Sequence, residues 1–534
     1  MKHFLIVSIS VAALVFTGCG DDPEPKGITT KPKPDTDSDF TAPTYADDYS
    51  AIAGWDRRSE WNLANVHDPS VVYDGEYYYM YGTDASYGNS HAGHGHFHAR
   101  RSKDLVNWSY IGAAMPETPA WVKDSLNNMR QREGLDPIES PMYGHWAPVV
   151  RKVGNKYRMY YSIIIDNYIK SGKPNTATNF DNSWTERAFI GLMETTSLKD
   201  NQWTDKGMVV CSVSDRGNDW SRTNRDTDWN GYFKWNAIDP SFIVTPEGEH
   251  WLIYGSWHSG IVALQVDAET GKPSKLESLE DYGVRIARRQ NNDANRWQAL
   301  EGPEVIYNEK TGYYYMFLAY DELSVAYNTR VCRSNSITGP WVGIDGRNIT
   351  EGGEAWPMVT HPYKFNLHSG WVGISHCAVF QNESNGEWFY ASQARLPENT
   401  NGNAFSNAIM MGHVRHIRWT DDGWPVVMPE RYAGVPQTEI KQSDLAGTWE
   451  NISMNYQFRE QQTASSLTLG ADGKATGAHT GNWSYDATNK VLTIGDLNLC
   501  VEWGLDWEAS PRTPTLVYSG LTSDGRPVWG KKKL

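Results

Sequence analysis

The sequence predicts an all-β protein: a five-bladed β-propeller followed by a small C-terminal β-barrel domain. Two observations carry this prediction. One pattern recurs five times between residues 48 and 432, and each copy pairs a turn containing glycine with a strand rich in aromatic residues. After Pro429 the composition changes to short strands of alternating apolar and polar residues. The length of 534 residues leaves room for both domains and for large cores.

Residues 1–19 have the features of a bacterial lipoprotein signal peptide. Lys2 precedes an apolar run from Phe4 to Phe16, which at about 13 residues is too short to span a bilayer. The small residues before Cys19 resemble a lipobox, in which Cys19 becomes the lipidated first residue of the mature chain. We expect a lipid anchor at the bacterial cell envelope, on the outer-membrane surface. Plain secretion with cleavage near Cys19 is the alternative.

Residues 20–47 consist largely of Pro, Lys, Asp and Thr. A segment with so few large apolar side chains cannot bury enough surface to fold and is typical of a tether. We expect it to hold the folded part of the chain away from the membrane.

Five segments share one pattern: a polar residue and a proline, three or four apolar residues, a turn with glycine, and an aromatic strand. They begin at His67, His145, Ile238, Glu301 and His376. In the fifth segment Ala378 stands where the others have proline, which assigns Cys377 to the position before it. Repeats of about 60 to 90 residues, each a small meander, are typical of propeller blades. We therefore expect five blades within residues 48–432.

A set of tryptophans and one helical segment complete the expected propeller. Four blades carry a tryptophan after a later polar turn, which predicts a shared outer-strand position for Trp108, Trp203, Trp341 and Trp424. The segment from Pro119 to Arg132 has a helical period, because four apolar side chains could share one face. These are Trp121, Val122, Leu126 and Met129.

Residues 444–534 are expected to form the barrel. Apolar and polar residues alternate there between Gly and Asp turns, as in LAGTWENI and KVLTIGDL. A stretch of about 90 residues is long enough for a separate all-β module.

The repeats predict which side chains meet. The first strand of every propeller blade lines the central channel, so residues at the start of these strands converge at one mouth. These residues are His67, Asp68, His145, Trp146, Asp239, Glu301 and His376. Three carboxyl groups without a basic partner repel one another, which raises at least one pKa. A protonated acid beside an ionised one suits glycoside hydrolysis, where one protonates the leaving oxygen and the other activates water.

These motifs resemble those of glycoside hydrolase family 43, whose members are five-bladed propellers that invert configuration. The resemblance implies that Asp68 of HDPS is the general base and Glu301 of LEGPE the general acid. It implies that Asp239 of NAIDPS tunes the acid and orients the substrate. Within the family, the segments WNAIDP and GSW and the C-terminal module resemble the extracellular endo-α-1,5-L-arabinanases. The implied substrate is arabinan, the polysaccharide of pectin side chains.

Residues beside the inner-strand motifs are candidates for substrate contacts. Trp146 and Trp257 each adjoin such a motif, and an indole ring can stack on the apolar face of arabinose. Asn236 and Ser256 could form hydrogen bonds with substrate hydroxyl groups.

Histidines suggest where a metal could bind. His376 matches a histidine that in arabinanases lies beside a bound calcium or similar ion, so we expect one divalent cation, Ca²⁺, near His376. A histidine that is simply hydrogen-bonded in the core is the alternative. A histidine-rich stretch falls where the third strand of blade one should run, and we interpret it as that strand rather than as a metal site. It contains His91, His94, His96 and His98.

The amino-acid composition indicates which classes of partner the protein can bind. The formal net charge is −15, so no basic excess is available to bind nucleic acid. The 24 Trp and 29 Tyr residues suit stacking on sugars. We expect a monomer that acts on a polysaccharide and contacts the membrane only through its lipid anchor.

Two alternatives to an endo-acting arabinanase remain open on the sequence. One is an exo-acting arabinosidase or β-xylosidase of the same fold, which differs in whether loops leave an open groove or close a pocket. The other is a glycan-binding surface lipoprotein without catalysis. The presence of Asp68, Asp239 and Glu301 together disfavours the second, since binding alone does not need all three.

Overall fold

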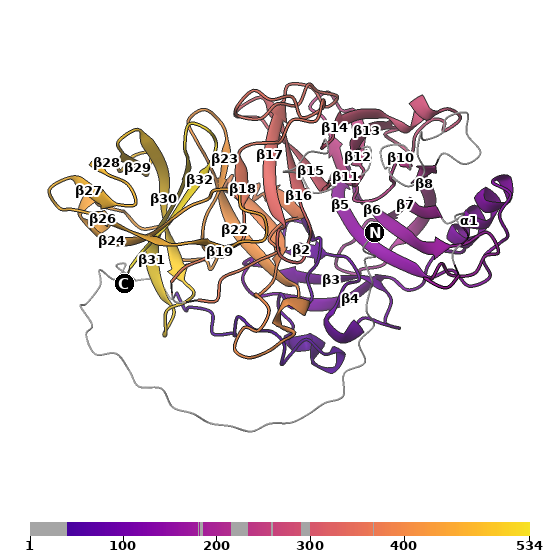
Figure 1. The fold of residues 1–534 in the computed structure, drawn as a ribbon, viewed down its shortest axis with the longest axis horizontal. Coiled ribbons are helices and arrows are strands. Elements are labelled where there is room, and N and C mark those ends of the chain that lie inside the picture. Colours follow the sequence, from indigo (N-terminus) through magenta and orange to yellow (C-terminus); the bar gives the residue numbers. More distant parts are fainter. Residues whose placement is uncertain are drawn as a thin grey trace. The chain divides into compact units, whose positions relative to one another are not determined.

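The computed structural model describes residues 40–179, 181, 185–214, 233–257, 260–289, 299–366 and 368–533 (Figure 1). Within these residues it contains five four-stranded blade sheets and one closed barrel, which confirms the all-β class, the five-bladed propeller and the barrel. The predicted signal peptide, Cys19 and residues 20–39 of the predicted tether lie outside the described residues. Residues 40–47 correct the end of the tether, because Phe40, Ala42 and Tyr45 pack against the barrel core and Asp47 pairs with Arg431.

Each blade is a sheet whose four antiparallel strands follow one another in chain order. Blade one comprises β1 (Ser70–Tyr73), β2 (Tyr78–Tyr81), β3 (His96–Ser102) and β4 (Ser109–Met115), and blade two β5 (Tyr143–Val153), β6 (Lys156–Tyr168), β7 (Thr185–Thr195) and β8 (Thr204–Cys211). Blade three comprises β11 (Ser241–Val244), β12 (His250–Tyr254), β13 (Ile261–Val266) and β14 (Val284–Ala287). Blade four comprises β15 (Leu300–Asn308), β16 (Tyr313–Tyr320), β17 (Asn328–Ser334) and β18 (Met358–Thr360), and blade five β20 (Cys377–Gln381), β21 (Trp388–Ala394), β22 (Met411–Trp419) and β23 (Pro425–Val427). The inner strands β1, β5, β11, β15 and β20 contact one another in this order, and β20 contacts β1, so the ring is closed.

The aromatic strands are explained by packing between blades. The second strand of a blade is buried on both faces, so its sequence is a continuous apolar run instead of an alternating one. In β2, for example, Tyr79 and Tyr81 are fully buried and share a core with Tyr161 and Phe189 of blade two. These rings fill the space between blades, which accounts for many of the aromatic residues that the sequence alone suggested for sugar binding.

The predicted tryptophan position holds in three of four blades. Trp108, Trp203 and Trp424 directly precede the outermost strands β4, β8 and β23. Trp341 instead lies between β17 and β18, where its neighbour Val342 bridges to Arg333 and Asn348. The connection before β18 is longer than in the other three blades, which separates this tryptophan from the outer strand.

Helices are few and short in the described residues. Helix α1 (Ala120–Arg132) confirms the predicted helical segment; Val122 and Leu126 are buried, and α1 contacts β8 of blade two. The remaining helical segments are α3 (Gln442–Leu445) and the 3-10 turns η1 (Trp55–Glu60), η2 (Tyr87–Asn89), η3 (Leu279–Tyr282) and η4 (Ser406–Ala408). In this part of the chain no helix has the length and apolar content needed to cross a membrane.

An ion pair ties four blades together at the axis. Arg151 Nη2 of β5 donates to Glu304 Oε1 of β15 at 2.5 Å. The same carboxylate accepts hydrogen bonds from Ser241 Oγ of β11 at 3.0 Å and from the Val379 amide of β20 at 3.1 Å. Blades two to five therefore share one buried carboxylate.

We expect Arg151→Met to lower the free energy of unfolding by about 3 kcal/mol, because it leaves the buried Glu304 carboxylate without its cation. Denaturant unfolding followed by tryptophan fluorescence measures this loss. Lys103→Met is the control: the Lys103–Glu76 pair is exposed, so its removal should change the free energy of unfolding by less than about 1 kcal/mol. Equal losses in the two variants would contradict the role given to Glu304.

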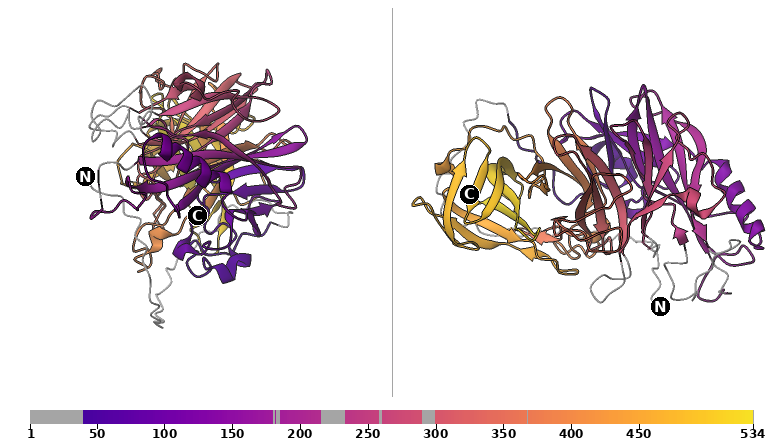
Figure 2. Two further views of the ribbon diagram at one scale, coloured as in Figure 1. Left: turned by 90° about the vertical axis from the view of Figure 1, so that its right-hand side faces the viewer. Right: turned by 90° about the horizontal axis from the view of Figure 1, so that it is seen from above.

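The barrel is closed by eight strands in a region that the structure describes throughout (Figure 2, yellow). They are β24 (Gly447–Ser453), β26 (Ser465–Leu469), β27 (Lys474–Gly477), β28 (Gly481–Asp486), β29 (Val491–Ile494), β30 (Leu497–Asp506), β31 (Thr513–Leu521) and β32 (Pro527–Lys532). Large side chains fill the interior, among them Trp449, Trp483 and Leu467. The barrel therefore has a packed core.

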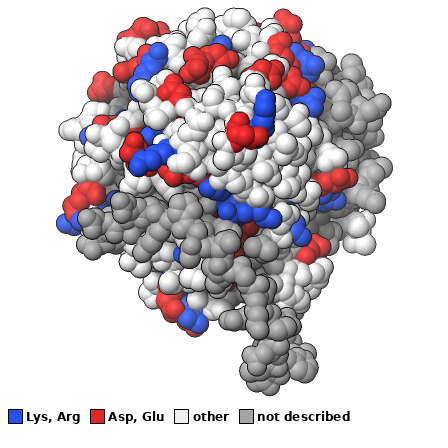
Figure 3. Space-filling model, turned by 90° about the vertical axis from the view of Figure 1, so that its left-hand side faces the viewer, with Lys and Arg blue, Asp and Glu red and all other residues white. Residues whose placement is uncertain are grey.

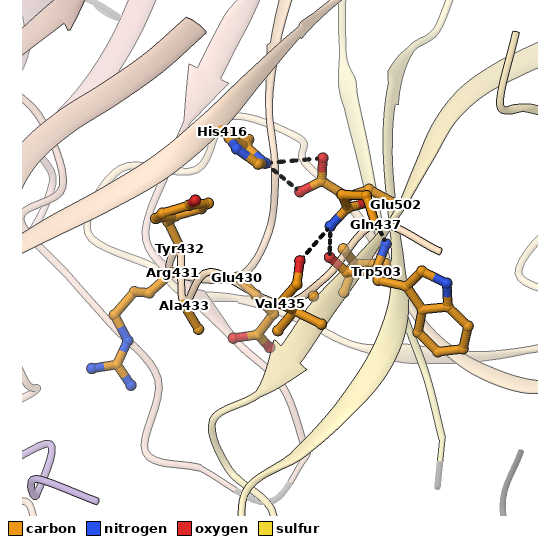
Figure 4. Close-up of a pocket in the computed structure, with 11 residues that line it drawn as sticks. His416, Glu430, Arg431, Tyr432, Ala433, Val435, Gln437, Glu502 and Trp503 are labelled. Atoms are coloured by element: carbon orange, nitrogen blue, oxygen red, sulfur yellow. Dashed lines mark hydrogen bonds and ion pairs between the residues drawn. The ribbon is translucent and has the colours of Figure 1, made fainter. Parts of the chain in front are cut away.

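The barrel and the propeller share polar contacts. Strand β19 (Tyr363–Lys364) pairs in parallel with β25 (Gln462–Thr463), and Tyr456 Oη donates to Asp321 Oδ2 at 2.9 Å. A cavity of about 300 Å³, including space open to solvent, also lies at this junction (Figure 4). In it His416 of β22 faces Glu502 of β30, with Nδ1 3.0 Å from Oε1. One further two-stranded sheet pairs β9 (Val213–Ser214) with β10 (Phe233–Trp235).

Charged side chains of both signs are interspersed over the face drawn in Figure 3. Lys and Arg lie singly or beside Asp and Glu on that face, with uncharged residues between them. This distribution is unlike the continuous basic stripe of a nucleic-acid-binding surface.

Candidate active site

The backbone takes the same turn at one equivalent position of each inner strand, just before β1, β11 and β20 and at a bulge within β5 and β15. The residue at this position has a left-handed φ in all five blades: Asp68 (46°), Ala147 (42°), Asp239 (54°), Gly302 (56°) and His376 (51°). A shared conformation aims equivalent side chains at one mouth of the ring. It also corrects the fifth repeat, because His376 holds the position that the sequence assigned to Cys377, and Cys377 replaces the proline.

Asp68 is held by three side chains. Its Oδ1 lies 2.9 Å from His376 Nδ1 and 3.4 Å from His67 Nε2, while its Oδ2 accepts a hydrogen bond from Thr83 Oγ1 at 2.6 Å. Burial alone would raise the pKa of Asp68, but His376, His67 and the Thr83 hydrogen bond outweigh it and hold the pKa well below its usual range. Asp68 is therefore ionised. The expectation that the three acids lack a basic partner was wrong, since His376 is that partner.

The surroundings of Asp239 and Glu301 raise the pKa of both carboxyl groups, in contrast to Asp68. Burial, with the negative charges of Glu301 and Asp68, raises the pKa of Asp239 to about 7. Burial also raises the pKa of Glu301. Asp239 Oδ2 accepts from the amide of Gly302, the residue after Glu301, at 3.2 Å. The pair is therefore placed to hold a proton near neutral pH.

Glu301 is oriented by donors on two further segments. Trp257 Nε1 donates to Glu301 Oε2 at 2.7 Å, and Ser256 Oγ donates to the same oxygen at 3.2 Å. Tyr327 Oη donates a short hydrogen bond to Oε1. These contacts fix both carboxyl oxygens.

Gly302 and His376 connect the two halves of the site. A Cβ atom at Gly302 would lie 2.8 Å from the His376 ring, so this position accepts only glycine without displacing the ring. Thr83, Asp68, His376, Gly302 and Asp239 thus form a continuous series of contacts. The ionised Asp68 and the Asp239 carboxyl of raised pKa lie along it, and Glu301 directly precedes Gly302. This is the pairing that acid–base hydrolysis needs.

Comparison with known proteins identifies the family. The model for glycosyl hydrolases family 43 matches residues 63–425, about two thirds of the chain. The chain belongs to glycosyl hydrolase family 43. A C-terminal lipocalin-like domain matches residues 429–530, which include the whole barrel up to Gly530.

Several family 43 arabinanases are similar over most of the chain. An extracellular endo-α-(1→5)-L-arabinanase of Thermotoga petrophila is 25% identical over 517 residues, 90% of this chain and 97% of the relative. Extracellular endo-α-(1→5)-L-arabinanase 2 of Bacillus subtilis is 24% identical over 495 residues, 88% and 93%. An extracellular exo-α-(1→5)-L-arabinofuranosidase of Cellvibrio japonicus is 24% identical over 373 residues, 68% and 86%. The solved endo-1,5-α-L-arabinanase of Thermotoga petrophila RKU-1 superposes with a TM-score of 0.64 at 22% identity, covering 88% and 99%, which shows the shared fold.

The predicted substrate residues lie in different settings. Trp146 has 37% of its surface exposed beside the mouth, so its ring is accessible. The indole N–H of Trp257 and the hydroxyl of Ser256 are directed to Glu301. Asn236 accepts from Ser212 Oγ at 3.1 Å and donates to the Ser256 carbonyl at 3.4 Å, so its amide is used within the protein.

Other residues of this family 43 site were missed by the sequence. Thr83 follows the second strand of blade one, Gln393 lies near the end of the second strand of blade five, and Tyr327 precedes the third strand of blade four. Gln393 Oε1 accepts from the Asp68 amide at 3.2 Å. Second strands end, and third strands begin, at the same mouth, so this rule could have indicated all three.

The cation expected near His376 stays a prediction. At His376, Nδ1 contacts Asp68, and the one group of three potential ligands found among the described residues lies elsewhere, at Asp84, His96 and His145. Ca²⁺ prefers six to eight oxygen ligands. The residues around His376 do not form such a set, so we derive no step through calcium. His145, expected beside the acids, instead has Nδ1 3.7 Å from Asp84 Oδ2.

Tyr327→Phe is expected to move the alkaline limb of the pH profile. The Tyr327 hydrogen bond lowers the pKa of Glu301, so its removal raises that pKa further. A general acid works only while protonated, and activity should therefore persist to higher pH in the variant. The profile of kcat/KM against pH measures the shift. Tyr307→Phe, which keeps all contacts of Glu301, should leave the limb in place, and an unshifted limb in Tyr327→Phe would contradict the assignment.

Proposed function

We propose that this chain is an inverting, endo-acting glycoside hydrolase that cleaves α-1,5-L-arabinofuranosidic bonds in arabinan. The observation that carries the proposal is the division among the acids: Asp68 has a lowered pKa, whereas Asp239 and Glu301 have raised ones. Two carboxyl groups kept in opposite protonation states at one mouth are what glycoside hydrolysis requires.

In this mechanism Asp68 is the general base. Ionised and fixed by Thr83 and His376, it accepts a proton from the attacking water as the oxygen bonds to the anomeric carbon. Glu301, held by Trp257 and Tyr327, donates its proton to the departing oxygen. One displacement inverts the configuration. Asp239 accepts a hydrogen bond from the Gly302 amide and so positions the segment that carries Glu301.

The proposed substrate is supported by the names of the relatives and by an exposed aromatic ring at the mouth of the propeller. Two curated relatives that match nearly 90% of this chain are named endo-α-(1→5)-L-arabinanases. A third, matching 68%, is named an exo-α-(1→5)-L-arabinofuranosidase, so exo action is the second candidate. The exposed Trp146 ring beside the mouth offers a stacking surface for arabinose.

We expect linear arabinan to yield a mixture of oligosaccharides at the first time points. Endo cleavage falls at internal bonds, so long products precede free arabinose. Chromatography of early products and the accompanying loss of viscosity measure this. Arabinose as the first and sole product would assign exo action instead, and xylan as the better substrate would assign the β-xylosidase alternative.

We also propose that the enzyme is a lipoprotein of the bacterial cell surface, anchored through Cys19. The signal-peptide pattern of residues 1–19 supports this. Cys19→Ala should abolish labelling of the chain by a radioactive fatty acid in producing cells. Labelling that persists in the variant would contradict lipidation at Cys19.

A further inference from the structure

Three metal-ligating side chains outside the hydrolytic mechanism lie together beside the mouth. Asp84 follows β2, His96 begins β3 and His145 lies in β5. One ligand atom from each lies within 4.8 Å of the other two, and no other group of three such side chains this close occurs in the described residues. We propose that Asp84, His96 and His145 bind one divalent transition-metal ion of the Zn²⁺ type.

The imidazoles face one carboxylate oxygen. Asp84 Oδ2 lies 2.5 Å from His96 Nδ1 and 3.7 Å from His145 Nδ1. The other oxygen, Oδ1, accepts a hydrogen bond from the Phe97 amide at 2.7 Å, which fixes the carboxylate. A hydrogen bond joins Asp84 Oδ2 and His96 Nδ1 across the short gap. Metal binding replaces such a hydrogen bond, because the ligand atoms must be free of protons.

Partners around the three side chains hold them in place. Thr118 Oγ1 lies 2.9 Å from His145 Nε2, and the Asp84 amide donates to the His145 carbonyl at 3.0 Å. A ligating histidine usually engages an outer partner with its second nitrogen, which sets the ring orientation. Thr118 supplies this partner, leaving Nδ1 of His145 directed toward Asp84.

The imidazole rings must open slightly to take the ion. His96 and His145 stack with centroids 3.4 Å apart and an angle of 12° between planes. Stacked rings send their lone pairs in parallel directions, whereas an ion needs them to converge. The side chain of His96 is 26% exposed and can turn toward the ion, while His145 stays fixed.

The donor set selects the class of metal. Two imidazoles and one carboxylate suit Zn²⁺, Co²⁺ or Fe²⁺, with the remaining positions left to water. Ca²⁺ prefers a shell of oxygens and should bind this set poorly. The site therefore differs in place and in kind from the calcium expected near His376.

The position of the ligands gives the ion a structural role. Asp84 and His96 belong to blade one and His145 to blade two, so an ion would join the two blades. Thr83, which donates to the Asp68 carboxylate, directly precedes Asp84. An ion at Asp84 would brace the segment that holds this hydrogen bond, and Asp84 is in this sense a positioning residue.

Calorimetric titration of the untagged, chelator-treated protein with Zn²⁺ tests the proposal in the absence of substrate. We expect one ion per chain and a rise in Tm on binding. Co²⁺ should give the visible absorption of a nitrogen-ligated ion. His96→Ala and Asp84→Asn should each weaken Zn²⁺ binding by at least about 100-fold. His94→Ala is the matched control from the same stretch, since its ring stacks on Trp55 with centroids 3.7 Å apart and it is not one of the three ligands.

Three results would overturn the proposal. They are the absence of stoichiometric Zn²⁺ binding by the wild type, unchanged binding in His96→Ala and Asp84→Asn, or displacement of Co²⁺ by an equal concentration of Ca²⁺. Circular dichroism shows whether each variant is folded, and His96→Ala is the least disruptive of the two because the His96 side chain is partly exposed. Zn²⁺ binding is measured without substrate, so the result does not depend on whether the chain is a hydrolase.

Discussion

Replacing Glu301 with alanine is expected to reduce kcat on linear arabinan by about 10²- to 10⁴-fold, the usual contribution of a positioned acid. The leaving sugar oxygen is a poor leaving group unless protonated, and burial raises the pKa of Glu301, which favours its protonated form. The acidic phenol of an aryl arabinofuranoside can leave without that proton. The reduction in kcat on this substrate should therefore be much smaller. The ratio between the two substrates is the measurement that identifies an acid.

Glu309→Gln is the matched control for Glu301→Ala. Glu309 is exposed at the turn between β15 and β16, so the variant should hydrolyse both substrates as the wild type does. Equal losses on arabinan and on the aryl substrate would remove the acid role from Glu301. If the wild type and Glu301→Ala released sugar at the same negligible rate, the chain would be a glycan-binding protein instead.

Asp68→Ala is expected to lower kcat on arabinan and on aryl arabinofuranosides alike, by about 10²- to 10⁴-fold. Every substrate needs an activated water, and Asp68 is the carboxylate that His376 keeps ionised. The alanine leaves a gap where a small anion can bind. Azide, which needs no base, should restore the rate on the aryl substrate and form a glycosyl azide of inverted configuration.

The configuration of that azide, read by NMR, separates the possible roles of Asp68. An inverted azide, together with an inverted hydrolysis product from the wild type, supports a base in an inverting enzyme. A retained azide would instead make Asp68 the acid/base residue of a retaining enzyme. Asp56→Asn serves as the control, because Asp56 is exposed in η1 and the variant should neither lose activity nor respond to azide.

The three acids could be placed from the sequence because a proline follows the turn that begins four of the inner strands. Asp68 and Asp239 stand directly before that proline, and Glu301 is one residue earlier. The fifth repeat lacks the proline, and its register was therefore set one residue too far along. Only the left-handed φ of His376 reveals the true equivalence.

The rest of the site depends on distances that a sequence does not carry. The contact of Tyr327 with Glu301 depends on how the segment between β16 and β17 folds. His96 in β3 and His145 in β5 are separated by β4 and α1, and their meeting at Asp84 follows from blade-to-blade packing. The repeats predict which positions of the inner strands are equivalent. They do not predict which side chains are brought into contact by the folding of the loops.

The shared left-handed turn also makes the ring a template for redesign. Asp68, Asp239 and His376 carry functional groups at this position, whereas Ala147 holds only a methyl group on an equivalent backbone. Gly302 cannot be replaced by a residue with a functional side chain, since a Cβ atom there would lie 2.8 Å from the His376 ring. Ala147 is 3% exposed, so blade two can take a small polar side chain such as serine there, whereas a larger acid or amide would displace its neighbours.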